Sequence, residues 1–461
     1  MRPLEITIPI LLATYLGWPH PRPGHVRLLP IAALALIPFH LLLEGYRWQM
    51  IPLYGLTLLL TVSSFLKIRS SRDWRPVASW LVLIPLAIAV ILPILLPVPS
   101  IPAPGGPFQV GTRLYELTDA SRVEIYSGRD EPRRFQIQIW YPADVRRSDE
   151  RAAWMMDAEV FAPAIASCIG MPSFFLDHLA LVKIPAYLES AVASTSKGFP
   201  IILFSHGWNG FSAQNTKQAI ELASRGYVVV AVQHTYGAVI TVFADGMIAY
   251  NNPTALPSGV SDEEYEAAAQ TLVDQWSGDL AFALDTLGTW NSNVQSPLGG
   301  KLDLSQVGVY GHSTGGGAAI QFCGTDPRCK ALLGMDPFMR PVSTRVLDEG
   351  ANVPAFFMFS QRWAEDVNSL NHRLFQRFTA NVPESLGVIA IEGTTHYDFS
   401  DLPLLSPLAS RLGLKGPISG RLVTAILNDY LIAFFDQTLK EIPTSLFEEQ
   451  DQKYNEVRFY N

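Results

Sequence analysis

Two kinds of apolar pattern divide this chain into a front part and a longer remainder. In the front part, apolar runs cover residues 28–43, 51–66 and 77–98, and a shorter, marginal run covers residues 4–18. Runs of this length approach the roughly 20 residues that a helix needs to cross a bilayer, and a single cleavable signal peptide does not account for several of them. The pattern predicts a membrane region of three to four helices over residues 1–98. Buried helices of a soluble protein are the alternative.

Basic residues are distributed unevenly over the short loops of this front part. The loop before the last apolar run is the most basic, with Lys67, Arg69, Arg72 and Arg75. The positive-inside rule places such a loop in the cytoplasm. The last run then leads outward, so we expect the remainder of the chain to be exocytoplasmic.

After a proline- and glycine-rich linker over residues 99–107, the pattern changes to short apolar runs between helical segments. The linker composition favours an extended, semi-rigid stalk. Residues 135–140 alternate like a half-exposed strand. Further strands are predicted at 201–204, 227–232, 307–310, 331–335, 355–359 and 387–391. Strands that alternate with helices predict an α/β domain over residues 108–461, with a mainly parallel sheet covered by helices on both faces.

The most specific motif follows the strand at 307–310. It reads Gly311-His312-Ser313-Thr314-Gly315 and continues with two more glycines. G-x-S-x-G between a strand and a helix is typical of the nucleophile elbow of α/β-hydrolases. Ser313 is therefore the predicted nucleophile. A glycine-rich turn with Ser313 as an ordinary helix cap is the alternative.

Two later strands end in the partners that such a serine needs. The run 331–335 ends at Asp336, and the run 387–391 leads to His396. α/β-Hydrolases place the acid and then the histidine after the serine in the chain. Asp336 could also cap a turn. The rival acids are Asp245, which precedes the nucleophile, and two residues within a helical pattern, Asp279 and Asp285.

An oxyanion hole needs two N–H donors near the nucleophile. The segment after the strand at 201–204 carries His206-Gly207-Trp208, and Thr314 follows the nucleophile. We assign the donors to the backbone of Trp208 and Thr314. His206 is expected to structure this loop, and His234 to make local hydrogen bonds.

On these residues the chain resembles the plasma-type platelet-activating factor acetylhydrolase family and its bacterial relatives. The resemblance covers nearly all of residues 108–461 and includes the segments 204–207, 233–245, 311–316, 336–341 and 393–401. It implies that Ser313, Asp336 and His396 form a catalytic triad that cleaves phospholipids with a short or oxidised sn-2 acyl chain, without a cofactor or metal. The residues after Asp336 depart from the family's best-known member, which leaves the acyl-chain preference open.

Two other functions remain open at this point. One is a broad carboxylesterase or polyester hydrolase that acts on soluble esters. The other is a membrane scaffold or transporter with an inactive hydrolase domain, which the intact Ser/Asp/His set argues against. The sequence leaves the oligomeric state open.

The net charge of the chain limits the classes of partner that it is expected to bind. The net charge is −8, and residues 1–98 carry eight basic and three acidic residues, so the remainder carries −8 − 5 = −13. This argues against nucleic acid and against electrostatic capture of anionic lipid. The expected partner, a lipid or small ester substrate, follows from the resemblance and the triad.

Three other features carry weaker expectations. Cys323 and Cys329 could form a disulfide if the domain is outside, which would leave Cys168 as a buried thiol. The apolar insertion at 154–193 is either a lid or lipid-facing wall, or ordinary core helices. Residues 236–243 are candidates for lining the acyl pocket.

Overall fold

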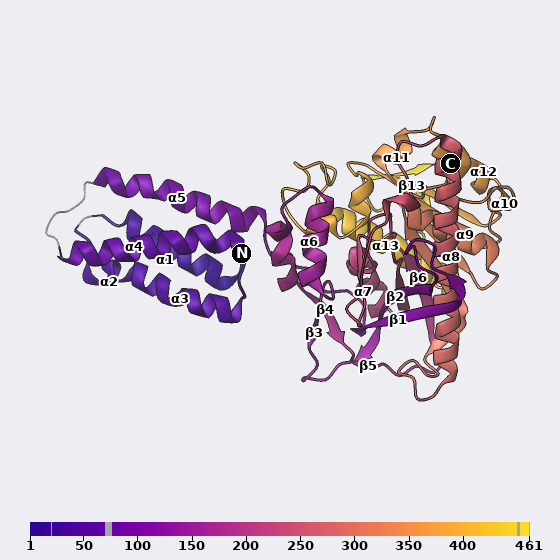
Figure 1. Cartoon of the computed structure of the whole chain (residues 1–461), viewed down its shortest axis with the longest axis horizontal. Helices are drawn as coiled ribbons and strands as arrows, with labels where there is room; N and C mark the ends of the chain where they lie inside the picture. The colour runs from indigo at the N-terminus through magenta and orange to yellow at the C-terminus, as the bar shows by residue number, and fades with distance from the viewer. Residues whose placement is uncertain (20, 70–75, 450–451, 461) are drawn as a thin grey trace.

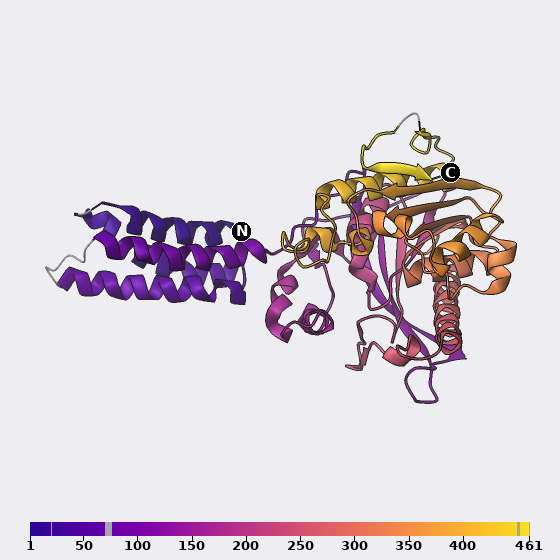
Figure 2. The same cartoon turned by 90° about the horizontal axis from the view of Figure 1, so that it is seen from above.

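The computed structural model describes the chain apart from residues 20, 70–75, 450–451 and 461, and apart from the side chains of residues 67–82. Its N-terminal helices form a rod that projects from one end of a larger α/β unit (Figure 1). Seen from above, the rod joins the α/β unit on the side where α6 lies (Figure 2).

The apolar runs of the front part form this rod. Its helices are α1 (Pro3–Gly17), α2 (Gly24–Arg27), α3 (Leu29–Leu43), α4 (Ile51–Arg69) and α5 (Pro76–Leu95), with a 3-10 turn, η1 (Trp48–Met50), before α4. Their inner side chains pack on one another in a small apolar cluster. Their outer side chains are also apolar, and Leu42 and Leu43 are 82% and 76% exposed. Helices that are apolar on all sides lack the polar face of a soluble surface helix.

The helices coincide with the predicted apolar runs to within a few residues, but they do not establish the expected multi-span membrane region. Among the described residues, only the helix over Trp48–Leu66 is long and apolar enough to be a candidate span, with 19 residues. α1 and α3 have 15 residues each, so they reach about 22 Å against the ~30 Å hydrocarbon core. α3 ends at Leu43, where its predicted run ends, and is followed by Glu44 and by Gly45 at a positive φ of 79°. The basic residues Arg72 and Arg75 of the 67–75 loop lie outside the described residues.

The larger unit is built on a sheet of 12 described strands. Their order is β14-β13-β12-β11-β10-β6-β7-β2-β1-β4-β3, with β5 paired to β2. The central strands from β7 to β13 are parallel, and antiparallel strands flank them on both sides. The parallel strands are β6 (Phe199–Ser205), β7 (Val228–Gln233), β10 (Leu302–His312), β11 (Ala331–Met335), β12 (Ala355–Ser360) and β13 (Ser385–Ile391).

This topology confirms the predicted, mainly parallel sheet and each of its predicted central strands. The flanking strands are β1 (Gln109–Val123), β2 (Pro132–Asp144), β3 (Arg151–Ala153), β4 (Lys183–Leu188), β5 (Ala191–Val192) and β14 (Val457–Tyr460); β8 (Ile240–Val242) and β9 (Ile248–Tyr250) pair separately. β2 differs from expectation, because it is buried on both faces. Its polar Gln136 is accommodated by donating a hydrogen bond to Val242 O (2.7 Å).

Successive side chains of each strand point to opposite faces of the sheet and pack in two hydrophobic cores, one on each face. On one face Ile202 and Phe204 pack with α7 (Thr216–Ser224) and α13 (Gly420–Leu439). On the other face Ile201 and Leu203 belong to the cluster that contains α8 (Asp262–Ser292), α9 (Thr314–Thr325), α10 (Thr344–Glu349) and α12 (Leu370–Thr379). The shorter helical pieces are η3 (Ser212–Asn215), η4 (Pro253–Ala255), α11 (Gln361–Glu365), η5 (His396–Phe399) and η6 (Leu402–Leu404). Ser261 caps α8 by accepting from Glu264 N (3.2 Å).

The linker is attached to the α/β unit and does not stand free as a stalk. Gly105 N donates to both carboxylate oxygens of Glu221 on α7 (3.1 and 3.2 Å), and Gly106 N donates to Ser224 Oγ (3.1 Å). The linker N–H groups need acceptors, and the side chains of α7 supply them.

The insertion at 154–193 forms the seam between the rod and the α/β unit. It folds as α6 (Ala158–Cys168) and η2 (Ser173–Leu181). Trp48 Nε1 donates to Phe175 O (3.1 Å), and Gln49 Nε2 is 2.9 Å from His178 Nδ1. The segment is therefore neither a lid over the active site nor only a core: it docks the helical rod.

Candidate active site

Ser313 sits on a strained turn between β10 and α9. Its φ of 57° and ψ of −122° lie where non-glycine residues are rarely found. The glycines around it are required by space: a Cβ on Gly311 would lie 2.1 Å from Gly315 O, and one on Gly315 would lie 2.1 Å from Ser205 O. The sequence therefore places Ser313 on an elbow at the C-terminal edge of the sheet, as its motif predicts.

Asp336 and His396 meet at the same edge of the sheet. Asp336 follows β11 and is fully buried, whereas the His396 side chain is 37% exposed. His396 Nδ1 lies 3.0 Å from Asp336 Oδ2. Ser360, at the end of β12, donates to Asp336 twice, from its backbone N (2.7 Å) and from Oγ (2.6 Å). These bonds hold the carboxylate in one orientation toward the imidazole.

Ser313, Asp336 and His396 line one open cavity of about 250 Å³. Its other lining residues are mostly aromatic or apolar: Trp208, Leu256, Tyr265, Thr314, Phe338, Trp363 and Asn371. Residues 236–243 are not among them, so that expectation is wrong; Phe243 instead lies under the guanidinium of Arg134, 4.2 Å from its ring centre. Tyr265, Trp363 and Asn371 were missed because each comes from a helical segment with no motif of its own.

A second histidine supports the segment that carries His396. The buried His312 donates from Nε2 to His396 O (2.9 Å), and the two rings lie 4.4 Å apart. Burial, followed by the nearby His396, holds the pKa of His312 well below its ordinary value. A neutral His312 is thus a fixed support under His396. The sequence placed His312 inside the motif, but no pattern signalled this role.

His206 fixes the loop that carries Trp208. The N–H of His234 donates to Nε2 of His206 (3.2 Å), so the ring proton is on Nδ1. Nδ1 then donates to Gly207 O (2.7 Å). That carbonyl shares its planar, trans peptide group with the N–H of Trp208, which therefore points the opposite way. Burial, followed by the charge of His234, lowers the pKa of His206 to about 3, so the ring stays neutral.

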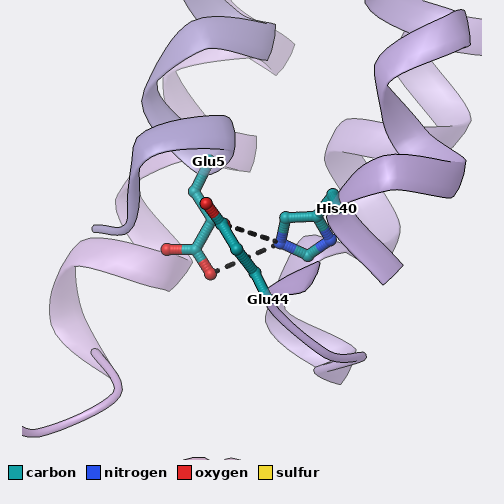
Figure 3. Close-up of side chains that lie close together, drawn as sticks. All are labelled: Glu5, His40 and Glu44. Atoms are coloured by element: carbon teal, nitrogen blue, oxygen red, sulfur yellow. Dashed lines mark ion pairs between the residues drawn. The ribbon is translucent and has the colours of Figure 1, made fainter. Parts of the chain in front are cut away.

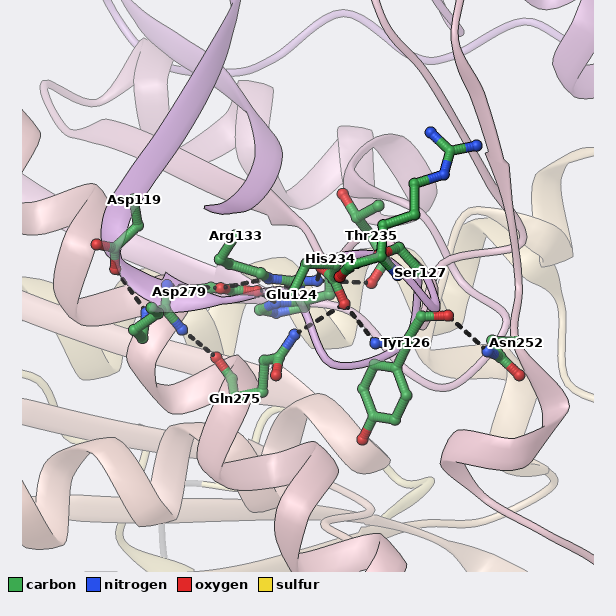
Figure 4. A network of polar contacts seen from close by, with 12 residues as sticks. Asp119, Glu124, Tyr126, Ser127, Arg133, His234, Thr235, Asn252, Gln275 and Asp279 are labelled. Carbon is green, nitrogen blue, oxygen red and sulfur yellow. Dashed lines mark hydrogen bonds and ion pairs between the residues drawn. The ribbon is translucent and has the colours of Figure 1, made fainter. Parts of the chain in front are cut away.

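A second serine–histidine–aspartate arrangement lies beneath this loop. Ser205 Oγ is 2.9 Å from His234 Nε2, and His234 Nδ1 is 2.9 Å from Asp279 Oδ2. Asp279 is also paired with Arg133 (2.6 Å) and Arg122 (2.9 Å), as Figure 4 shows for Arg133. Burial alone would raise the pKa of Asp279, but Arg133 and His234 hold it below its ordinary value.

Access separates this buried arrangement from the one at Ser313. Ser205, His234 and Asp279 are each 0% exposed. Trp276 stacks on His234 with ring centres 4.2 Å apart. A substrate carbonyl has no path to Ser205, so the network is structural. As expected from the sequence, His234 makes local hydrogen bonds.

One cluster in the rod has the donor types of a metal site. His40 Nε2 lies 3.6 Å from a carboxylate oxygen of Glu5 and 3.6 Å from one of Glu44 (Figure 3). Arg2 (2.7 Å) and Arg47 (2.6 Å) already pair with Glu5. Because two guanidinium groups balance the two carboxylates, we interpret the cluster as an ion-pair network that joins α1 to the end of α3.

Two of the three cysteines form a disulfide, and the third is a free thiol. Cys323 and Cys329 form a disulfide with Cα atoms 5.2 Å apart. Cys168 is exposed, so the expectation of a buried thiol is wrong. It is the last residue of α6.

Comparisons with known proteins identify the family of this chain. The sequence model of the family described as platelet-activating factor acetylhydrolase, isoform II, matches residues 97–455. A platelet-activating factor acetylhydrolase from Cavia porcellus is 27% identical over 362 residues, which cover 74% of this chain and 78% of that protein. A probable 1-alkyl-2-acetylglycerophosphocholine esterase from Arthroderma benhamiae is 26% identical over 51% of this chain and 58% of its own length. The structure of a ferulic acid esterase from Streptomyces cinnamoneus aligns with a TM-score of 0.65 at 24% identity, covering 79% of this chain and all of that one, which shows a shared fold.

Proposed function

This chain belongs to the platelet-activating factor acetylhydrolase, isoform II, family and is an ester hydrolase, and we propose that it cleaves the short or oxidised sn-2 acyl ester of phospholipids with Ser313. One observation carries the proposal. The strained Ser313 shares an open cavity with His396, whose Nδ1 is hydrogen-bonded to a buried carboxylate.

The proposed reaction follows from the protonation states of this pair. The carboxylate of Asp336 can only accept, so Nδ1 of His396 carries its proton and Nε2 is free to take one. His396 removes the proton of Ser313 Oγ as Oγ attacks the ester carbonyl. The same proton passes to the departing alcohol when the ester bond breaks. Water, activated by His396, then releases the acid from the acyl-enzyme.

The negative charge on the carbonyl oxygen needs fixed donors. We assign these to the N–H groups of Trp208 and Thr314. Thr314 begins α9, where the first N–H groups of a helix have no acceptor within it. Trp208 is oriented through His206 and Gly207 O. Donors held in advance stabilise the transition state more than the substrate, because they need no reorganisation.

The membrane association of the N-terminal rod is the second part of the proposal. It is supported by the outward-facing apolar side chains of the rod. The exocytoplasmic position of the α/β unit is supported by the Cys323–Cys329 disulfide, since such bonds persist in oxidising compartments. Protease added to intact cells should digest residues 108–461. Protection of this unit until the membrane is permeabilised would reverse the orientation.

The catalytic proposal is tested with the full-length protein and its Ser313→Ala and Asp336→Asn variants. Ser313→Ala should lose fluorophosphonate labelling and at least ~10³-fold of kcat. Asp336→Asn should be severely impaired, because Nδ1 loses its acceptor. A panel of short-acyl phospholipids, their long-chain analogues and p-nitrophenyl esters tests the substrate. Equal kcat/KM on both phospholipid classes, or cleavage of soluble esters alone, would instead favour a broad carboxylesterase.

A further inference from the structure

A partly open apolar cavity lies at the seam between the rod and the α/β unit. Its volume is about 130 Å³, and its walls come from the end of α5, from α6 and η2, and from residues 400–414. Figure 1 shows α5 ending beside α6 at this seam. The lining side chains are mostly hydrocarbon: Leu96, Trp154, Ile165, Ile169, Phe175, Leu176, Leu179, Phe211, Leu402, Leu405, Ala409, Leu412 and Leu414.

The polar side chains in the wall are already hydrogen-bonded elsewhere. Ser406 Oγ donates to Leu95 O (2.6 Å), and Ser400 Oγ donates to Tyr397 O (2.8 Å). Gln214 Nε2 donates to Asn215 Oδ1 (2.9 Å). The cavity therefore offers a water molecule little to bind. An apolar cavity of about 150 Å³ in another protein stays dry and binds benzene, a ligand of six carbons.

The cavity wall is connected to the catalytic residues. Ser400 directly follows η5, the 3-10 turn that begins at His396. The next residue, Asp401, donates from its N–H to Gln214 O (2.7 Å) and accepts from Thr216 N (2.8 Å). Gln214 Nε2 also reaches His312 Nδ1 (3.4 Å). The segment that carries His396 thus separates the apolar cavity from the catalytic cavity.

The cavity also lies near exposed apolar side chains of the rod. Ile84, Ile88, Ile91 and Ile94 of α5 are between 48% and 59% exposed. Their spacing of three and four residues places them along one side of the helix. Ile94 is two residues before Leu96, which lines the cavity. A hydrocarbon chain that contacts the end of this stripe is therefore close to the cavity wall.

We propose that this cavity binds the end of a long hydrocarbon chain of a membrane lipid, five to six carbons by volume, next to the segment that carries His396. The lipid is either the substrate itself, through its uncleaved chain, or a neighbouring lipid of the bilayer. The proposal rests on the proposed function only in taking a lipid ester as the substrate. It gives the rod a role in lipid capture besides attachment.

The test is photo-crosslinking of full-length protein in lipid vesicles. The probe is a diether phospholipid, which contains no cleavable ester, with a diazirine at the end of one chain. We expect labelled peptides from residues 165–179 and 402–414. Ala409→Phe fills the cavity and should reduce this labelling at least tenfold. Ile169→Trp, at a 40% exposed position of the wall, is a second variant that disturbs packing less.

Two controls make the result decisive. Ala164→Phe alters α6 where it lines a separate groove beside Cys168, and should leave labelling unchanged. Hydrolysis of p-nitrophenyl acetate should stay within about twofold in every variant, which shows that folding and the catalytic residues are intact. The proposal would be overturned if neither Ala409→Phe nor Ile169→Trp reduced the labelling. It would also be overturned if the label fell only on residues of the catalytic cavity.

The two sources of the chain are separated with the Ser313→Ala variant. A short-acyl alkyl phospholipid that displaces the probe identifies the substrate chain as an occupant. Labelling that this lipid does not displace identifies a neighbouring lipid. Because labelling needs no catalysis, an enzyme that is labelled but cleaves no lipid ester would refute the proposed function and leave the cavity assignment standing.

Discussion

The role of His206 can be separated from mere packing by two substitutions that each keep one of its ring nitrogens. In His206→Asn, the side-chain amide nitrogen overlaps the position of Nδ1 and can still donate to Gly207 O. In His206→Gln, the side-chain oxygen overlaps Nε2, so it can still accept from His234 N but the bond to Gly207 O is lost. We expect kcat to fall in the Gln variant and to be largely kept in the Asn variant.

The magnitude follows from the bonds at Gly207 O. This oxygen accepts from His206 Nδ1 (2.7 Å) and from Gly210 N (2.9 Å), so one bond remains when the first is removed. A net hydrogen bond contributes about 0.5–1.5 kcal/mol, whereas complete loss of an oxyanion donor costs about 10²–10³-fold in kcat. Loosening the Trp208 N–H should therefore cost roughly tenfold, or about 1.4 kcal/mol.

The assay compares kcat and KM on a short-chain ester with inhibition by an alkyl trifluoromethyl ketone. The ketone adduct with Ser313 places an oxyanion where the two N–H groups meet. In His206→Gln the inhibition constant should rise by about the factor by which kcat falls, with KM unchanged. If the Asn and Gln variants are equally slow, or if the ketone binds both as tightly as wild type, His206 does not act through the oxyanion loop.

Three further predictions concern stability. Asp279→Asn should cost about 1.5–3 kcal/mol in urea unfolding, because it removes a charged hydrogen-bond acceptor of the buried Arg133, which keeps only Glu124 as a paired carboxylate; a loss of kcat without a loss of stability would contradict the structural assignment. Burial lowers the pKa of His206 to about 3 and that of His178 to about 4, from 6.5, so the folded state binds fewer protons than the unfolded state between these values. The contribution of these two histidines to the free energy of unfolding is therefore complete above pH 6.5 and is lost as pH falls toward 4, by on the order of 2 kcal/mol per histidine at pH 4.5. The stability of His206→Asn should depend less on acid than that of the wild type. Equal urea midpoints of the wild type at pH 7.5 and 4.5 would refute this. Opening the small loop closed by Cys323 and Cys329 should cost about 2 kcal/mol, measured by urea unfolding of Cys323→Ser.

The sequence was most informative where a local pattern implies a geometry. The elbow around Ser313 needs glycines at fixed positions, and the order of the strands places Asp336 and His396 at the same edge of a parallel sheet. These relations depend on a few neighbouring residues and on topology. The apolar runs of the front part located the helices of the rod to within a few residues. An apolar run does not by itself reveal whether its helix crosses a membrane.

Contacts between distant segments had no such signal. Ser360 is an ordinary strand-end serine in the sequence, yet it donates twice to Asp336. Trp363 and Asn371 reach the catalytic cavity from helices that follow β12. The docking of Phe175 on Trp48 joins residues 127 positions apart. Such pairs are set by how the elements pack, which no single local pattern records.

The two serine–histidine–aspartate arrangements show what the sequence argument lacked. Asp279 was set aside as the catalytic acid because it lies in a helical pattern, but the structure shows that a helical aspartate can orient a histidine well. What disqualifies it is its surroundings. Its charge is already balanced by Arg133 and Arg122, and the serine at the far end of the chain of bonds is sealed from solvent. Asp336 is equally buried, but its histidine is 37% exposed and opens onto a cavity. We therefore propose Ser313 and not Ser205 as the nucleophile, because of these two arrangements only the one at Ser313 combines a buried carboxylate with an accessible histidine.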